Sequence, residues 1–218
     1  MGPREWGPIF RTPGLWKVEM LYWAHYLFRF LPLDIWLQAR AYDRPFADFR
    51  FGDTPWFTAQ DILREAELGA DDNFVDLGSG RGKMVFMANM FFHCPATGIE
   101  LLPTYIKVAR RIARRAGCSG VSFLQQDFLS ADLSQATVIY VCAAALCEET
   151  LDDVLLLVNT MKSGARFITV GWRPQKPQLD FLKEKEYIFS WGREIVYFQR
   201  VRPLEEQPEE YEEARPYH

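Results

Sequence analysis

The stretch Phe74-Val-Asp-Leu-Gly-Ser-Gly-Arg-Gly82 decides the fold class of this 218-residue chain. Its first four residues form a short apolar run that is typical of a buried strand, and a helical pattern follows at 83–92. The glycines between them let the backbone turn sharply and approach a ligand where a Cβ would clash. This order of strand, glycine turn and helix predicts one unit of a parallel sheet, with a ligand site at the carboxyl end of the strand.

The same alternation continues along the chain. We expect further strands at 96–100, 121–125, 138–142 and 165–171, with helices between them at 103–116 and 148–161. Two β-rich stretches then follow, 186–191 and 194–200, separated only by Gly192 and Arg193, and they are expected to pair as a hairpin. The sequence therefore predicts an α/β domain with a doubly wound, mostly parallel sheet and one antiparallel strand.

The segment before this core is expected to be a helical extension. Glycines and prolines predict an irregular arm over 1–13, helical patterns follow at 15–30 and 34–41, and 42–57 reads as an ordered loop. Thr58-Ala-Gln-Asp61 resembles a capping box that opens a helix ending at Gly69. We divide the chain into an extension and loop at 1–57, the α/β domain at 58–203 and an acidic tail at 204–218.

Charge and composition exclude several classes of protein. The net charge is −4, but the glutamate-rich tail alone carries a net −5, so the body at 1–203 is near neutral at +1 and gives no general reason to expect nucleic-acid binding. The four cysteines form no C-x-x-C pair and are expected to be free thiols in a reducing, cytoplasmic setting. With three scattered histidines, no metal site is predicted.

Two surface features leave alternatives open. Charged residues interrupt the aromatic segment 15–37, so it does not qualify as a spanning helix, but it is expected either to pack as a lid or to lie in a membrane interface. Five basic residues lie along the helix at 103–116, and a solvated helix face explains them better than nucleic-acid contact does.

Acidic side chains at successive strand ends indicate a nucleoside ligand. Asp76 precedes the glycines, and Glu100 ends the next strand, where it is well placed to accept both hydroxyls of a ribose. Asp127, followed by the aromatic Phe128, would suit the amine and the ring of an adenine. Buried carboxylates are unfavourable unless something pairs with them. The alternative for Asp76 and Asp127 is that they cap helices or close turns.

Together these residues resemble the class I S-adenosylmethionine-dependent methyltransferases, over about 54–201. Val75–Gly82 corresponds to their first motif, Gly98-Ile-Glu100 to the ribose-binding acid, and Gln126-Asp-Phe128 to the adenine contact. The resemblance implies a Rossmann-like sheet of seven strands ending in a hairpin, and S-adenosyl-L-methionine as cofactor. It assigns the cofactor to Asp76, Gly78, Ser79, Gly80, Gly82, Glu100, Leu101, Asp127 and Phe128.

A narrower group, the non-SET histone lysine methyltransferases and their bacterial relatives, is also similar. Phe51-Gly-Asp-Thr-Pro55 resembles the loop that closes over the cofactor there, which implies N-methylation of a protein lysine. Where that group has Asn-rich residues after the fourth strand, this chain has Cys142-Ala-Ala-Ala145. A small-molecule or lipid amine as acceptor, or a catalytically silent cofactor-binding module, therefore stay as alternatives. A dinucleotide-dependent oxidoreductase is disfavoured because the glycines do not follow Gly-x-Gly-x-x-Gly.

Methyl transfer is an in-line displacement for which the cofactor supplies the electrophile, so the protein mainly aligns the partners. The polar residues expected near the methyl group are Asp53 and Thr54, which we take as candidate catalytic residues, and Glu148. Trp56 and Trp172 are candidate walls of the acceptor site, where they could stack on a cation. The alternatives are that the tryptophans are packing residues and that Asp53 and Thr54 only form a turn.

Overall fold

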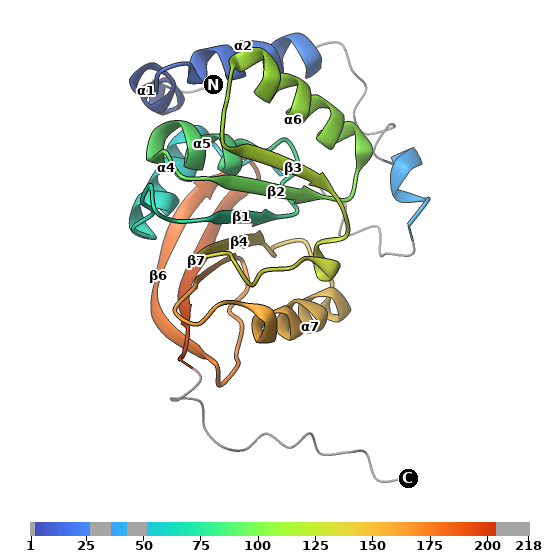
Figure 1. Cartoon of the computed structure of the whole chain (residues 1–218), viewed down its shortest axis with the longest axis vertical. Coiled ribbons are helices and arrows are strands. Elements are labelled where there is room, and N and C mark those ends of the chain that lie inside the picture. Colours follow the sequence, from blue (N-terminus) through green and yellow to red (C-terminus); the bar gives the residue numbers. More distant parts are fainter. Residues whose placement is uncertain (1–2, 27–35, 43–51, 204–218) are drawn as a thin grey trace.

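The computed structural model describes residues 3–26, 36–42 and 52–203, and its centre is a seven-stranded sheet (Figure 1). The strand order is β3-β2-β1-β4-β5-β7-β6. Strands β1 to β5 are parallel, and β7 runs antiparallel to both β5 and β6. The predicted sheet is therefore confirmed. Its strands are β1 Phe74–Leu77, β2 Ala96–Glu100, β3 Val121–Gln125, β4 Val138–Cys142, β5 Arg166–Val170, β6 Leu179–Phe189 and β7 Gly192–Val201.

Helices cover both faces of this sheet, which is why its central strands β1 and β4 are largely apolar and almost entirely buried. One face packs against α4 (Trp56–Glu65), α5 (Lys83–Phe92) and α6 (Pro103–Ala116), and helices α1 (Pro3–Arg11) and α2 (Leu15–Tyr26) lie outside them. The other face packs against α7 (Glu148–Leu157) and the short 3₁₀ helices η2 (Phe128–Ser130) and η3 (Val158–Thr160). The two faces bury separate hydrophobic clusters.

The amino-terminal arm is not irregular, so that prediction was wrong. Residues 3–11 form α1, with Pro3 at the first helical position, where a missing N–H leaves no bond unmade. Pro8 removes one bond inside the helix, but Ile9 is buried in the hydrophobic core, and this tertiary packing outweighs the local signal. The helix predicted at 15–30 is confirmed as far as Tyr26, and residues 36–39 are helical. The rest of those two predictions lies outside the described residues.

Two helix boundaries also differ from the prediction. Helix α4 begins at Trp56, directly after Pro55, and ends at Glu65, so there is no capping box at Thr58. The Thr58 hydroxyl instead donates a hydrogen bond to the carbonyl of Ile188 in β6. Helix α7 stops at Leu157 and continues only as the 3₁₀ turn η3.

The terminal hairpin exists, but its turn is two residues earlier than predicted. Strand β6 begins at Leu179, with an irregularity in its pairing near Leu182, and the turn is formed by Ser190 and Trp191. Gly192 already belongs to β7, where its φ of 146° is accessible to glycine. This shift places the Trp191 side chain at the tip of the hairpin instead of inside a strand.

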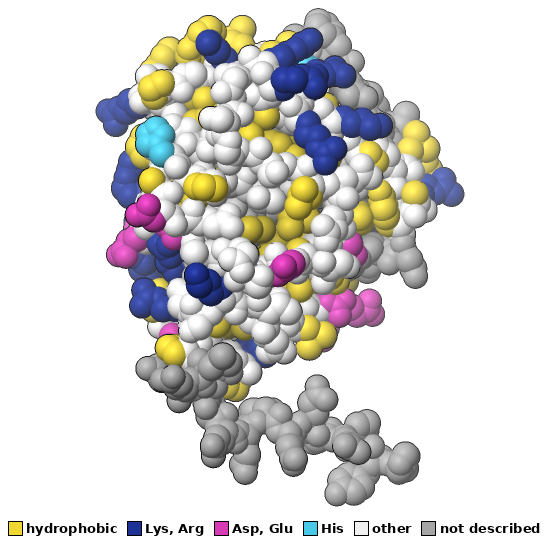
Figure 2. All heavy atoms as spheres, in the orientation of Figure 1, with side chains coloured by type: hydrophobic (Ala, Val, Ile, Leu, Met, Phe, Trp, Pro, Cys, Tyr) yellow, Lys and Arg dark blue, Asp and Glu magenta, His cyan; other side chains and the backbone are white. Residues whose placement is uncertain are grey.

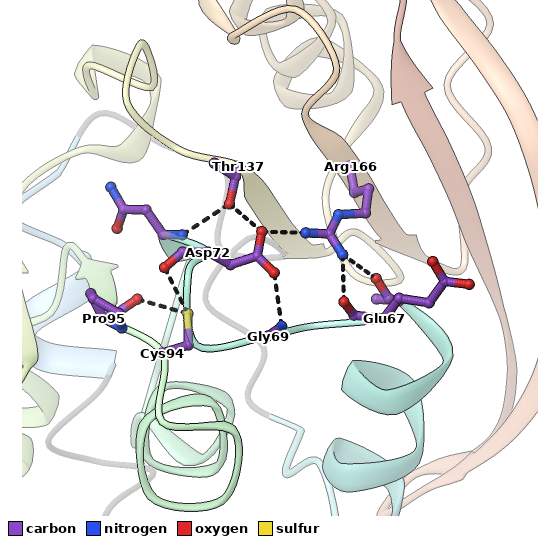
Figure 3. A network of polar contacts seen from close by, with 9 residues as sticks. Glu67, Gly69, Asp72, Cys94, Pro95, Thr137 and Arg166 are labelled. Atoms are coloured by element: carbon purple, nitrogen blue, oxygen red, sulfur yellow. Dashed lines mark hydrogen bonds and ion pairs between the residues drawn. The ribbon is translucent and has the colours of Figure 1, made fainter.

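A polar network closes the amino-terminal edge of the sheet (Figure 3). The carboxylate of Asp72 pairs with Arg166 and accepts hydrogen bonds from the Thr137 hydroxyl at 2.7 Å and the Gly69 N–H at 2.8 Å. Arg166 also donates to the carbonyl of Glu67 at the end of α4, at 2.8 Å. The network therefore joins the entry to β1 with β5 and α4.

Candidate functional site

A cavity of about 400 Å³ opens at the carboxyl-terminal edge of the parallel strands. This is the edge at which open α/β sheets bind ligands. The ends of β1, β2 and β4, the glycine loop, the loop before α4 and the tip of the β6–β7 hairpin all contribute to its wall. Most residues predicted for the site line it together, namely Asp53, Thr54, Asp76, Gly78, Ser79, Gly80, Glu100, Leu101, Asp127 and Phe128.

Backbone contacts fix the glycine loop against β2. The N–H groups of Gly78 and Ser79 both donate to the carbonyl of Ile99 at 2.9 Å. Gly82 does not line the cavity; it has a φ of 84°, and a Cβ there would lie 2.5 Å from the ring of Phe123. Gly82 is therefore needed for the turn and for close packing, whereas Gly78 lies at the cavity itself.

The deepest part of the cavity holds two carboxylates. Glu100 accepts hydrogen bonds from the N–H groups of Gly80, at 2.9 Å, and Leu102, at 2.8 Å. Burial raises the pKa of Glu100, although these backbone donors lower it in part. Burial also raises the pKa of Asp76 well above its usual range, and the neighbouring charge of Glu100 adds to the shift. Both acids are thus held where donors from a ligand would stabilise their ionised forms.

Asp127 lines the cavity and also caps a helix. Its Oδ1 accepts a hydrogen bond from the N–H of Leu129, 3.0 Å away, at the start of η2. The capping role that the sequence left open is thus present together with the position at the cavity. Phe128 follows it and lies half-buried, with its ring 4.0 Å from the Cβ position of Gly78.

Of the two candidate catalytic residues, Asp53 lies at the rim and Thr54 is buried in the cavity wall. The Asp53 carboxylate forms an ion pair with Lys83, with 2.6 Å between the charged atoms, and its backbone N–H donates to the Ser190 hydroxyl at 2.8 Å. Thr54 is buried and lines the cavity, as does Tyr140 of β4. Burial, with further contributions from Cys142 and Asp76, raises the pKa of Tyr140 well above its usual range. Tyr140 therefore stays a neutral hydroxyl.

The predicted tryptophan walls were wrong. Trp56 is fully buried, donates its indole N–H to Glu19 of α2 at 2.7 Å and lies beneath the Lys83 ammonium, which is 5.0 Å from the ring centre. Trp172 packs against the hydrophobic cluster on the other face of the sheet. Neither is among the described residues that line the cavity, and Trp191 is the tryptophan that does so.

The cavity contains further residues that the sequence reasoning missed. No local motif marks them, because they come from the ends of β4, α6 and the hairpin. An aromatic at the tip of a hairpin would have been the only sequence signal, and the misplaced turn hid it. They include Tyr105, Tyr140, Cys142, Leu146, Trp191 and Glu194.

Tyrosines and a glutamine from the amino-terminal extension contact the same edge of the sheet. The Tyr22 hydroxyl donates to the carbonyl of Arg81 in the glycine loop at 2.6 Å. The Tyr42 hydroxyl donates to the carbonyl of Leu101 at 3.0 Å. The Gln38 side chain accepts from the N–H of Thr104 in the first turn of α6 at 3.1 Å. The extension thus supports the loops that form the cavity.

Within the described ranges, no group of three acidic, cysteine or histidine side chains lies close enough together to hold a metal ion. In the same ranges, no helix has the length and apolar character needed to cross a bilayer.

Known proteins resemble this chain in the segment that builds the cavity. The family model of the ANTKMT methyltransferase domain matches residues 76–178. The adenine nucleotide translocase lysine N-methyltransferase of Mus musculus is 34% identical over 110 residues, which are 49% of this chain and 48% of that protein. A protein-lysine N-methyltransferase of Saccharolobus islandicus (strain REY15A) is 28% identical over 130 residues, 56% of this chain and 80% of its own. The chain thus spans about half the length of the mouse relative.

Two solved structures share this fold. An RNA methyltransferase from Salinibacter ruber, in complex with S-adenosyl-L-homocysteine, superposes with a TM-score of 0.54 and 28% sequence identity. The match covers 70% of this chain and 94% of that one. TrmN from Thermus thermophilus, at 18% identity and a TM-score of 0.58 over 67% of this chain and 48% of that one, shares the fold.

Proposed function

We propose that this chain, which belongs to the class I S-adenosylmethionine-dependent methyltransferases, transfers a methyl group from that cofactor to a lysine side chain in a protein. One observation carries the proposal. Both relatives in the preceding comparison are named as lysine methyltransferases, and the family model matches residues 76–178, which include most of the residues that line the cavity.

The residues of the cavity fit S-adenosyl-L-methionine. Glu100 is buried with a raised pKa, and hydroxyl donors of a ribose would satisfy its carboxylate. Asp127 and Phe128 stand where an adenine amine and ring would lie, and the turn at Gly78 and Gly80 leaves the backbone open to the rest of the cofactor. When bound, the cofactor supplies an activated methyl group on a sulfonium.

Residues at the rim and buried residues of the cavity wall would together position the acceptor amine. A lysine amine must lose its proton to gain a free lone pair, and removal from water lowers the pKa of the ammonium. Buried Thr54 and Tyr140 provide neutral hydroxyls there, which can accept a hydrogen bond without stabilising a positive charge. Asp53 is held by Lys83 and would orient the amine from the rim.

Incubation of the pure protein with tritiated methyl donor and a fractionated lysate tests this proposal. We expect label in protein, and in methyl-lysine after hydrolysis. The matched control is Glu100→Ala, which should bind the donor poorly and transfer little label. Label confined to lipid, RNA or small amines would refute the protein acceptor. Donor binding without any transfer would support the catalytically silent alternative, which the alanines at 143–145 suggested.

We also propose that the amino-terminal helices contact an anionic membrane surface. Large apolar side chains of α1 and α2 are exposed, with Phe10 at 75%, and the exposed Lys17 stacks on one of them. In Figure 2, hydrophobic side chains at the top of the molecule adjoin Lys and Arg side chains that gather over α2 and α6. Aromatic residues beside basic ones suit the interface of an acidic bilayer. The exposed apolar residues are Trp6, Phe10, Trp16, Met20 and Trp23.

Sedimentation with vesicles distinguishes a lipid surface from an ordinary exposed patch. We expect binding to vesicles containing phosphatidylserine, weaker binding in high salt, and loss of binding in Phe10→Ser/Trp16→Ser. Equal binding to neutral vesicles, or none to acidic ones, would contradict it. Fractionation of cells tests the cytoplasmic location that the free thiols predicted.

A further inference from the structure

The tip of the β6–β7 hairpin forms one rim of the cavity together with the loop before α4. Ser190 accepts a hydrogen bond from the N–H of Asp53 through its hydroxyl at 2.8 Å and donates its own N–H to the Asp53 carbonyl at 3.2 Å. A Cβ at Gly52 would fall 2.2 Å from the ring of Trp191, so the indole lies directly on the backbone there. The hairpin and the loop are therefore fixed to each other.

The Trp191 side chain is held in one orientation. Its ring stacks on Phe189, with the centroids 4.7 Å apart and the planes at 27°. Its indole N–H donates to Oε1 of Glu194 at 3.2 Å. Two independent contacts therefore present an aromatic ring and a carboxylate side by side at the cavity wall. Because they are already ordered, a ligand would lose little side-chain entropy by binding them.

Glu194 differs from Asp53, the other acid at the rim, in having no cation beside it within the described part of the chain. Asp53 is neutralised by Lys83, whereas among the described residues no cation lies within ion-pair distance of Glu194. Its negative charge reaches the cavity: burial raises the pKa of Cys142 to about 12, and the charges of Asp76 and Glu194 add to that shift. The rim thus presents a negative charge beside an aromatic ring.

Part of the cavity wall is apolar. Ala144, Ala145 and Leu146 follow the end of β4 and line the same cavity as the hairpin tip and the buried carboxylates. They offer methyl groups and an isobutyl group, which suit a chain of methylenes but give no hydrogen bond to a polar chain. The alanines that replace the expected asparagines thereby leave room for an aliphatic side chain.

We infer that Trp191 and Glu194 form the subsite that captures the cationic end of an aliphatic amine, such as a lysine side chain, at the entrance to the cavity. The inference rests on the proposed function. An ammonium is attracted by a carboxylate and by the exposed part of an indole ring, whereas a norleucine side chain, which ends in a methyl group and lacks the ammonium, carries no charge to be attracted. The pair recognises the charged acceptor at the rim, whereas the neutral amine needed for transfer forms deeper, beside Thr54 and Tyr140.

The indole N–H resonance of Trp191 reports on this subsite, and its absence in Trp191→Phe assigns it. We would titrate the protein, saturated with S-adenosylhomocysteine, with N-acetyl-lysine methylamide and with the neutral norleucine analogue. The resonance should shift with the lysine compound only. Glu194→Gln should weaken that binding about ten-fold and leave the affinity for S-adenosylhomocysteine unchanged. Glu186→Gln, which removes an exposed ion pair of the same hairpin with Arg193, is the matched control and should bind like the parent.

Each outcome is decisive. Equal shifts with both compounds would reduce the site to an apolar groove and overturn the inference. No shift in protein that has bound S-adenosylhomocysteine would also overturn it while leaving the methyltransferase proposal intact. Failure to bind S-adenosylhomocysteine would instead remove the proposed function itself, and the inference with it.

Discussion

Asp72 lies two residues before the four-residue strand β1 and Asp76 lies within it, yet the pKa values of their carboxyl groups shift in opposite directions. Burial alone would raise the pKa of Asp72, but hydrogen bonds from Gly69, Thr137 and Arg166 together lower it below the usual value. The pKa of Asp76 is raised far above it, because burial is reinforced by the charge of Glu100. The first carboxylate is satisfied by the protein, and the second stands at a cavity.

The contrast separates a structural acid from a ligand-binding one. A buried carboxylate with its donors supplied contributes to folding, whereas one without them is stable only as the neutral acid or with a bound partner. The two edges of the sheet should therefore respond oppositely to pH. Stability from Asp72 is present above its unfolded pKa and is lost as the pH falls through its folded value, while that from protonated Asp76 is lost as the pH rises through its folded value.

Arg166→Met should produce the largest effect. The Arg166 and Asp72 side chains are only 19% and 15% exposed, so removal of the cation leaves a largely buried charge. We expect a loss of about 3 kcal/mol in the free energy of unfolding, with affinity for S-adenosylhomocysteine unchanged. Urea denaturation and calorimetry measure the two quantities. If the double variant with Asp72→Asn is as unstable as the single one, the unpaired charge is not the cause.

Glu100→Gln should show the reverse pattern. We expect the affinity for S-adenosylmethionine to fall by about 1.5–3 kcal/mol, the value of charge-assisted hydrogen bonds, while the free protein keeps or gains stability. The gain follows because a buried acid with a raised pKa is replaced by a neutral amide. Calorimetry and thermal unfolding of the same samples provide the test. Unaltered cofactor affinity would show that the ribose assignment is wrong.

Cofactor binding should also release protons. Asp76 and Glu100 have raised pKa values in the free protein, and hydroxyl donors would favour their ionised forms. Affinity should therefore rise with pH below the folded pKa values, by at most about 1.4 kcal/mol per pH unit for one proton. Calorimetry in two buffers of different ionisation enthalpy counts the protons. Proton uptake on binding would contradict this picture.

Asp127→Ala should have the smallest effect of these substitutions, but it should lower both the stability of the protein and its affinity for the cofactor. The loss of the cap on η2 should reduce stability by about 1 kcal/mol, and the loss of the adenine contact should weaken binding less than Glu100→Gln does. Asp127→Asn, which keeps a capping oxygen, should restore stability without restoring the full affinity. If Asp127→Asn restored stability and affinity equally, the role of Asp127 would be limited to capping η2.

The residues that the sequence placed at the edge of the sheet, and that line the cavity there, are those whose position depends on neighbouring residues. The glycine loop, Glu100 at the end of β2 and Asp127 after β3 follow from a strand pattern and the residues at its end. Trp56 was misjudged because its partners, Glu19 and Lys83, come from helices far away in the sequence. Its burial depends on how those helices pack, which no local pattern encodes.

The part of the cavity that was missed depends on the position of the hairpin turn, and two further predictions stay untested. Trp191 became part of the site only because the turn formed at Ser190, two residues before the position that glycine chemistry suggested. The domain limits stay predictions, although α4 already begins at Trp56. The lid expected from the segment 15–37 stays a prediction, because residues 27–35 of that segment lie outside the described residues.

The packing of α2 also has a consequence during protein synthesis, because α2 is made well before the helix on which it packs. Its buried side chains Leu15, Val18 and Tyr22 pack in a core shared with α6, which begins at Pro103. At a synthesis rate of 5–20 residues per second, roughly 4–16 s pass between the synthesis of α2 and that of α6. Both its inner and its outer apolar surfaces are then exposed on the ribosome. We expect nascent chains that are arrested before Pro103 to bind chaperones. Chains that extend beyond α6 should no longer bind them. Pull-down of stalled ribosomes would measure the difference.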